Sequence, residues 1–242
     1  MKKKDAQIKV DGVEMAGHFF EPATGFPGVL FVHGWAGSQK RDERRSRAIA
    51  QLGCICLTFD MRGHGDMHEH LKTVTPAENL ADVCSAYDAL ARHPGVDSGS
   101  IAVVASSYGA YLATLLTSCR SVRWLGMRVP ALYEDEAWEV AKYSLDRKEL
   151  QDFRSAQVPV RSNRALRSCT DFQGDVLIVE SENDHLIPHA TIASYIASFV
   201  KARSITHRLI EDADHALSTP ASRHAYDDLL LGWIREMVLN AR

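Results

Sequence analysis

The chain has 242 residues, 45% of them hydrophobic, and a formal net charge of −3 at pH 7. This is enough for one large single-core domain or two small ones, and no charge asymmetry indicates nucleic acid or an anionic membrane as a partner. Five cysteines without a C-x-x-C pair predict no disulfide framework and favour a reducing cytoplasm. The basic start at 2–4 is followed by polar residues and not by an apolar stretch, so we expect no signal peptide. No run approaches the ~18 apolar residues of a membrane span, so we expect no membrane-spanning segment.

The N-terminal part of the chain predicts antiparallel strands. Asp11-Gly12, between extended stretches at 7–10 and 13–15, is a hairpin signal, and another extended stretch follows at 17–20. We expect these strands to form an edge of the main sheet.

From residue 28 onward, apolar strands alternate with helices. The predicted strands lie at 28–32, 54–59, 101–105, 122–127, 176–179 and 205–210, and the predicted helices at about 41–52, 76–92, 108–119, 188–200 and 219–239. This alternation predicts an α/β fold, with a mostly parallel, doubly wound sheet and helices on both faces. The rhythm breaks at about 130–171, where Tyr133 and Trp138 stand among many charges, and this predicts a small helical lid inserted into a single domain of residues 1–242.

The helix at about 41–52 has a charged outer face. Both signs occur on it, so we interpret it as a solvated face with i,i+4 ion pairs rather than as a phosphate-binding patch. Its charged residues are Arg41, Asp42, Glu43, Arg44, Arg45 and Arg47.

Only Ser106 and Ser107 separate the apolar strand at 101–105 from the helix that follows it. So tight a strand-to-helix turn strains its central residue and presents that side chain at the carboxyl edge of the sheet. The residues two positions to either side must be small. Ala105 and Gly109 meet this condition around Ser107, whereas larger residues flank Ser106, so Ser107 is the predicted nucleophile.

An acid to support Ser107 is expected in the loop after the strand at 176–179, because reactive groups lie at the carboxyl ends of parallel strands. Glu182 and Asp184 both occupy this loop. We favour Asp184, since it lies a few residues past the strand and just before the next helix. The alternative is that both are turn residues.

A general base is expected in the loop after the last strand, where His215 follows Asp214. His207 lies inside that strand and His224 inside the last helix, so neither can swing freely over the turn at Ser107. The predicted catalytic triad is therefore Ser107, Asp184 and His215, with the histidine accepting the serine proton and the carboxylate orienting the imidazole. An oxyanion hole is predicted from the backbone N–H groups of Tyr108 and Trp35.

Together these motifs resemble the α/β-hydrolase fold serine hydrolases over essentially the whole chain. The matching features are His33-Gly34, Asp60-x-Arg62-Gly63-x-Gly65, the Ser107 turn, Asp184 and Asp214-His215. The chain is similar to bacterial carboxylesterases, to cinnamoyl (feruloyl) esterases and to dienelactone hydrolase-like enzymes. It departs from their pattern at Ala105, which stands where glycine is usual, and at Asp66, which stands where serine is usual.

The resemblance implies a cytoplasmic esterase that cleaves a small to medium carboxylic ester through an acyl-Ser107 intermediate, without a metal or organic cofactor. The alternatives are the same triad acting on a thioester, an amide or peptide, or a lactone, and a non-catalytic binding protein on the same fold. Tyr133 and Trp138 are predicted either to line the substrate pocket or to form the lid's own core. The histidine-rich loop 64–70 is interpreted as a polar rim rather than a metal site. The lid and the N-terminal edge strands are candidate surfaces for a homodimer.

Overall fold

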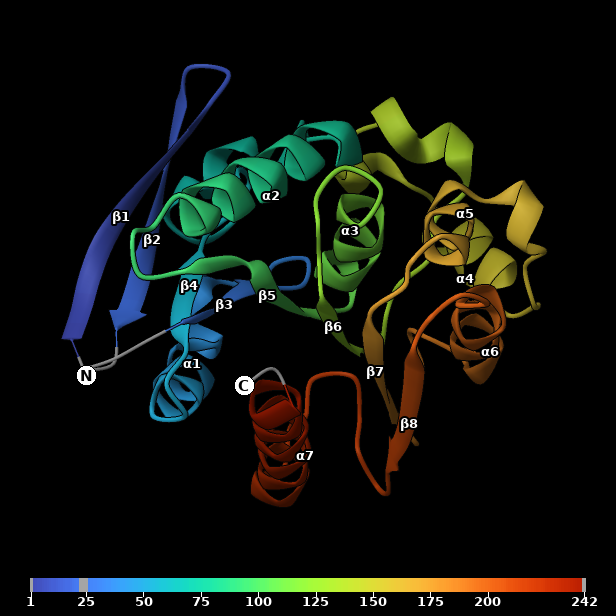
Figure 1. Cartoon of the computed structure of the whole chain (residues 1–242). Coiled ribbons are helices and arrows are strands. Elements are labelled where there is room, and N and C mark those ends of the chain that lie inside the picture. Colours follow the sequence, from blue (N-terminus) through green and yellow to red (C-terminus); the bar gives the residue numbers. More distant parts are fainter. Residues whose placement is uncertain (1, 22–25, 241–242) are drawn as a thin grey trace.

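A computed structural model describes residues 2–21 and 26–240 and arranges its eight strands in one sheet, in the order β1-β2-β4-β3-β5-β6-β7-β8 (Figure 1). The strands are β1 (Lys2–Val10), β2 (Val13–Glu21), β3 (Pro27–Val32), β4 (Ile55–Phe59), β5 (Asp97–Ser106), β6 (Trp124–Arg128), β7 (Asp175–Ser181) and β8 (Ser204–Ile210). β2 pairs antiparallel with both β1 and β4, and every pair from β4 to β8 is parallel. The predicted α/β architecture with antiparallel N-terminal edge strands is confirmed.

Helices cover both faces of this sheet, as Figure 1 shows, with α1 and α7 on one face and α2, α3 and α6 on the other. The α-helices are α1 (Glu43–Ala50), α2 (Pro76–Ala91), α3 (Tyr108–Leu116), α4 (Arg147–Arg154), α5 (Arg164–Thr170), α6 (His189–Ser198) and α7 (Pro220–Asn240). The side-chain alternation of the buried strands supplies both cores, because successive residues point to opposite faces. In β3, Leu30 and Val32 enter the core under α2 and α3, whereas Val29 and Phe31 enter the core under α1 and α7.

The N-terminal hairpin turns at Asp11 and Gly12, which both have positive φ, as a two-residue type I′ turn requires. The extended stretches predicted at 13–15 and 17–20 are parts of the single strand β2. This strand pairs with β1 along its whole length, and its residues 17–20 also pair with β4 on the other side, with Phe20 opposite Cys56. The hairpin therefore extends the main sheet instead of packing on it.

Several predicted boundaries differ from the structure by a few residues, and two of the differences have local reasons. The helix predicted at 41–52 begins as a 3₁₀ turn, η1 (Gln39–Arg41), and continues as the shorter α1. The strand predicted at 176–179 extends in both directions to become β7, because Asp175 and Ser181 each pair with β8. None of the helices in residues 2–21 and 26–240 combines the length and apolarity needed to cross a membrane.

The segment 130–171 connects β6 to β7 with short helices and no strand among its residues, all of which are described. Besides α4 and α5 it contains the 3₁₀ helices η3 (Asp135–Glu139), η4 (Lys142–Ser144) and η5 (Val160–Ser162). Side chains tie it down at several points. The Arg154 Nε donates to the Leu132 carbonyl at 2.9 Å, and the Asn163 Nδ2 donates to the Tyr133 carbonyl at 2.7 Å. Whether this segment acts as a lid stays a prediction.

The first turn of α3 packs directly on the end of β3. A Cβ built on Gly109 would lie 2.4 Å from the carbonyl oxygens of both Val32 and His33, so no other residue fits there without moving backbone. By contrast, a Cβ on Gly232 in α7 would meet nothing within 4 Å. Packing against β3 therefore requires glycine at position 109, whereas position 232 has room for a side chain.

We predict that Gly109→Ala lowers the free energy of unfolding by about 2 kcal/mol or more, because the new methyl group overpacks a rigid backbone contact. Gly232→Ala is the matched control and should raise it by about 0.5–1 kcal/mol, the usual gain from replacing glycine inside a helix. Urea denaturation of both variants measures the difference. Equal effects would contradict the packing argument.

Candidate active site

Ser107 occupies the turn between β5 and α3, and its backbone is strained. Its φ of 51° and ψ of −117° lie in a region that side chains of L-residues rarely adopt, which costs about 1–3 kcal/mol. Neighbouring backbone holds it there, since its N–H donates to the Arg128 carbonyl at 2.9 Å and its carbonyl accepts from the Ala131 N–H at 3.1 Å. Ser106 is the last residue of β5. The structure thus puts Ser107, as predicted, at the centre of the turn.

His215 and Asp184 are joined by a hydrogen bond of 2.7 Å between the imidazole Nδ1 and the carboxylate Oδ2. The other carboxylate oxygen accepts from the backbone N–H groups of Leu186 at 2.8 Å and Ile187 at 2.9 Å. The Asp184 side chain is 1% exposed, while that of His215 is 24% exposed. The loop after β7 therefore aims a fixed, buried carboxylate at a more accessible imidazole.

The competing residues from the sequence have other partners. Glu182 accepts from the backbone N–H of Asp212 at 2.8 Å, which ties the loop after β7 to the loop after β8. His207 lies in β8 with its Nε2 3.0 Å from a carboxylate oxygen of Glu180. His224 lies on α7 and is exposed. The structure brings none of these three to the Asp184–His215 pair.

The loop after β3 is held in shape by His33. The His33 Nε2 accepts from the Met61 N–H at 3.2 Å, so the Nδ1 carries the proton and donates to the Gly34 carbonyl at 2.9 Å. The Gly37 N–H donates to that same carbonyl at 3.0 Å. In a trans peptide the N–H points opposite to the carbonyl, so these two bonds fix the direction of the Trp35 N–H.

His33 and His64 are buried neighbours whose ring centroids are 5.0 Å apart. Burial lowers the pKa of His33 to about 4. Burial, followed by the proximity of His33, lowers the pKa of His64 to about 3. Both rings are therefore neutral at pH 7, which suits the hydrogen bond that His33 accepts.

Tyr108, the residue after Ser107, is anchored by a buried polar network. Its hydroxyl donates to the Asn79 side chain at 3.0 Å, and Asn79 donates to the Asp82 carboxylate at 3.1 Å. The Asp82 side chain is fully buried, and it accepts from the Arg62 Nε at 2.7 Å. The network connects the start of α3 to α2 and to the loop after β4.

A close contact between Asp60 and Gly65 explains why these two residues belong to one motif in the loop after β4. The Asp60 carboxylate accepts from the Gln39 N–H at 2.7 Å, and a Cβ on Gly65 would lie 2.4 Å from it. Glycine also suits the positive φ of 56° at this position. Among the residues that the structure describes, no cluster of His, Cys, Asp or Glu is arranged to hold a metal ion.

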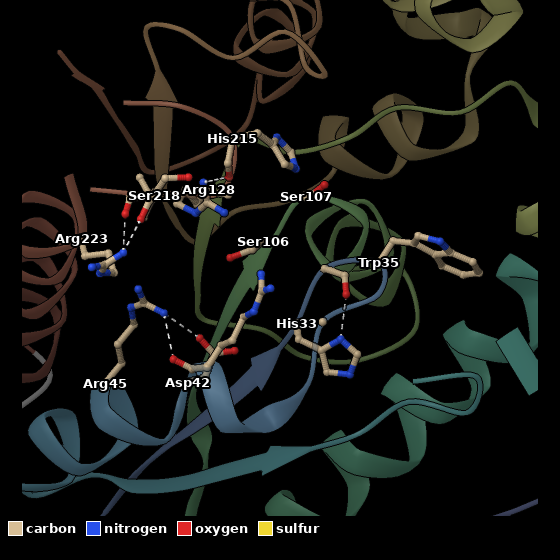
Figure 2. A pocket seen from close by; sticks show the side chains of 15 residues that line it. His33, Trp35, Asp42, Arg45, Ser106, Ser107, Arg128, His215, Ser218 and Arg223 are labelled. Carbon is tan, nitrogen blue, oxygen red and sulfur yellow. Dashed lines mark hydrogen bonds and ion pairs between the residues drawn. The ribbon is translucent and has the colours of Figure 1, made fainter. Parts of the chain in front are cut away.

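A cavity of about 440 Å³ contains both Ser107 and His215 in its walls (Figure 2). It lies against the loop after β3, the ends of β5 and β6, the start of α1, and the segment that leads into α7. The residues that line it are His33, Gly34, Trp35, Gly37, Arg41, Asp42, Arg45, Ser106, Ser107, Arg128, His215, Ala216, Leu217, Ser218 and Arg223. It thus brings together the predicted nucleophile, the predicted base and one predicted oxyanion residue.

The two aromatic residues predicted as substrate contacts lie outside this cavity lining. Tyr133 is buried, and its ring centroid is 4.9 Å from that of Tyr111. Trp138 is half-buried with the Arg164 guanidinium 4.5 Å from its ring centroid. The Lys142 ammonium lies 4.1 Å from the Trp35 ring centroid, and burial lowers the pKa of this lysine to about 7. A role for Tyr133 and Trp138 in binding substrate stays a prediction.

The structure corrects the interpretation of the charged helix and adds residues that the sequence analysis missed. The charged face at 41–47 is only partly solvated, because Asp42 is buried and Arg41, Asp42 and Arg45 line the cavity. The expected i,i+4 pair does occur, between Arg47 and Glu43 at 3.6 Å. Arg128 was missed altogether, although an arginine that ends an otherwise apolar strand was a usable signal.

The chain matches the model of the Alpha/beta hydrolase family over residues 29–228 and belongs to that family. It is also similar to an uncharacterized protein of Mycobacterium tuberculosis, at 32% identity over 124 residues that cover 50% of this chain and 42% of that protein. The aligned part covers less than half the length of each curated relative that it matches.

Two solved structures show the same fold. Dienelactone hydrolase from Anabaena variabilis superposes with a TM-score of 0.71 at 16% identity, covering 97% of both chains. An acylaminoacyl peptidase of Pyrococcus horikoshii gives a TM-score of 0.74 at 15% identity, covering 96% of this chain and 41% of that one. At these identities the likeness establishes the fold alone.

We predict that the protein loses stability as the pH falls from about 6.5 toward 4. The folded-state pKa values of His33 (about 4) and His64 (about 3) lie below the 6.5 of a free imidazole, so the unfolded chain binds more protons in this window. Each histidine should lower the free energy of unfolding by about 1.4 kcal/mol per pH unit there. Denaturant titrations at several pH values measure this slope.

His64→Phe keeps an aromatic ring and removes one titrating group, so the slope should shrink by about half relative to wild type. His68→Phe is the control, because His68 is exposed in the same loop and its replacement should leave the slope unchanged. An unchanged slope in His64→Phe would contradict the assignment of His64 as a buried imidazole that is neutral in the folded protein.

Proposed function

We propose that the protein is a serine hydrolase that cleaves a small to medium carboxylic ester through an acyl-Ser107 intermediate. The observation that carries this proposal is the Asp184–His215 hydrogen bond of 2.7 Å, next to a cavity that also contains the strained Ser107. Family membership agrees with hydrolase chemistry. Fold alone does not define a substrate, so the argument rests on the site.

The first half of the reaction forms the acyl-enzyme. His215 accepts the Ser107 hydroxyl proton at Nε2 as the serine oxygen bonds to the ester carbonyl carbon. Asp184 holds the imidazole with Nδ1–H toward its carboxylate and stabilises the imidazolium. When the ester C–O bond breaks, the proton passes from Nε2 to the leaving alcohol.

The second half repeats these steps with water. His215 accepts a proton from water as the water oxygen bonds to the acyl carbon, and the proton returns to the Ser107 oxygen when the acyl–serine bond breaks. In both halves the negative oxygen is stabilised by the backbone N–H groups of Tyr108 and Trp35. This chemistry needs no cofactor from outside the chain.

The same groups would act on a thioester, an amide or peptide, or a lactone, because each reacts through an acyl intermediate at serine. The structural likeness to an acylaminoacyl peptidase and to a dienelactone hydrolase keeps the amide and lactone alternatives open. A binding protein without activity is the alternative of another class. We also propose a cytoplasmic location, on the composition of the chain, and a small-molecule substrate, on the cavity of about 440 Å³.

We predict that a fluorophosphonate adds once to the wild-type protein and not to Ser107→Ala, as measured by intact mass. Activation of serine by a neighbouring base is the physical reason. Ser106→Ala is the matched control and should keep the adduct. An unlabelled wild-type protein would favour the binding-protein alternative, and a labelled Ser107→Ala variant would contradict the choice of nucleophile.

We predict that Asp184→Asn lowers kcat on an ester substrate by about 10⁴-fold with a small change in KM, because the amide favours the wrong imidazole tautomer. Glu182→Gln is the control, since Glu182 contacts the Asp212 backbone and not His215. Steady-state kinetics with para-nitrophenyl hexanoate measure both. Equal losses in the two variants would contradict the assignment of Asp184.

A further inference from the structure

The cavity beside Ser107 has an unusually cationic wall. Four arginines from three separate parts of the fold line it, namely Arg41 and Arg45 near the start of α1, Arg128 at the end of β6, and Arg223 in the first turns of α7. Asp42 is the acidic residue among the lining side chains. Figure 2 shows Arg45, Asp42, Arg128 and Arg223 around the same cavity as Ser107 and His215.

Internal ion pairs neutralise only part of this charge. Arg45 lies 3.1 Å from Asp42 and 2.7 Å from Asp227, and Asp227 also pairs with Arg44. Two arginines and two aspartates therefore balance each other, and the charge of Asp42 is already matched within the protein.

The other three arginines have no such direct partner, since Asp42 acts on Arg41 and Arg128 only from beyond ion-pair distance. Within residues 2–21 and 26–240, no carboxylate lies at ion-pair distance from Arg41, Arg128 or Arg223. Arg223 donates through Nη1 to the Leu217 and Ser218 carbonyls, at 3.0 and 2.7 Å. These bonds hold its guanidinium beside the loop that carries His215.

Arg128 is the most informative of the three, because it is 8% exposed and still lacks a carboxylate partner. Its Nη1 donates to the His215 carbonyl at 2.9 Å, and its guanidinium lies 5.7 Å from the Tyr226 ring centroid. Burial lowers the pKa of Arg128 from its ordinary value. Asp184 and Asp42 act on it only from beyond ion-pair distance. Burying a guanidinium without a counter-charge in direct contact is unfavourable, so this position favours a bound anion.

Arg128 is also fixed close to the reacting serine. Its carbonyl accepts from the Ser107 N–H at 2.9 Å, and it pairs with Ser106 across β5 and β6. Val129, which follows it, has a φ of 41°, a rare conformation for a β-branched residue. The backbone of Arg128 is therefore constrained on both sides and held next to Ser107, while the bond to the His215 carbonyl holds its guanidinium.

We propose that the substrate of Ser107 carries an anionic group, a carboxylate or a phosphate, which Arg128 binds together with Arg223 and Arg41. The proposal rests on the proposed function, since it names the substrate class of the same site. A guanidinium suits either anion because its planar N–H donors match two oxygens at once. The anion replaces the carboxylate partner that the three arginines lack within the protein.

Two pairs of esters test this, because the anion can belong to the acyl part or to the alcohol part. The acyl pair is the para-nitrophenyl half-ester of adipic acid and para-nitrophenyl hexanoate. The alcohol pair is para-acetoxybenzoate and para-acetoxybenzamide. We expect wild-type kcat/KM to favour the anionic member of at least one pair by about 10- to 100-fold, the usual worth of a charged hydrogen bond.

The variants are read as the ratio of anionic to neutral kcat/KM, so a general loss of activity cancels. Arg128→Met should lower this ratio by at least about tenfold, and Arg128→Lys should recover part of it, because lysine keeps the charge but not the paired donors. Arg223→Gln, a change at an exposed residue, should lower it less. Arg47→Gln is the control, since it removes the same charge from α1 outside the cavity and should leave the ratio unchanged.

Inhibition of hexanoate ester hydrolysis by glutarate and by inorganic phosphate distinguishes the two anions. The tighter competitive inhibitor identifies the group, and its inhibition should weaken in Arg128→Met. If wild type hydrolyses the neutral esters but shows no anionic preference and no inhibition by either anion, the anion site is wrong while the hydrolase stands. If neither ester of either pair is hydrolysed and no fluorophosphonate adduct forms, the proposed function itself is wrong.

Discussion

The contact between the first turn of α3 and the end of β3 is the constraint on which the candidate site depends. Gly109 lets the helix approach the Val32 and His33 carbonyls without a side chain between them. Because the helix starts so close to the sheet, no room remains for a relaxed turn, and Ser107 takes its positive φ. The same closeness puts the Tyr108 N–H beside the loop after β3, where the second backbone donor of the proposed oxyanion hole lies.

Irregular loops surround this contact, and buried side chains hold them where regular hydrogen bonding is absent. His33 fixes the Gly34 carbonyl, and the Arg62–Asp82 pair joins the loop after β4 to α2 and, through Asn79, to Tyr108. Such groups are satisfied in the interior mainly by one another. The buried polar network therefore holds these loops in place, as strand pairing holds the sheet.

Much of this was predictable because the deciding signals are local. The small residues around Ser107 and the position of Asp184 past its strand depend on a few neighbouring positions, and the structure brings Asp184 to His215 as expected. The arginine cavity was not predictable in the same way. Arg45 meets Asp227 across 182 residues of sequence, and Arg128 meets the carbonyl of His215 across 87. A charged helix face looks solvated until the packing of α1 against α7 is known, and strand ends depend on neighbouring strands that the local pattern does not contain.

The strain at Ser107 has an evolutionary consequence. A glycine at this position would relieve a conformation that costs about 1–3 kcal/mol, which is a sizeable share of the 5–15 kcal/mol that stabilise a typical domain. Selection for robustness alone would thus favour loss of the hydroxyl, and under the proposed function a serine here trades thermodynamic stability for reactivity. Descendants of such a chain that were released from their chemistry would drift first at this residue, and the fold would survive the change.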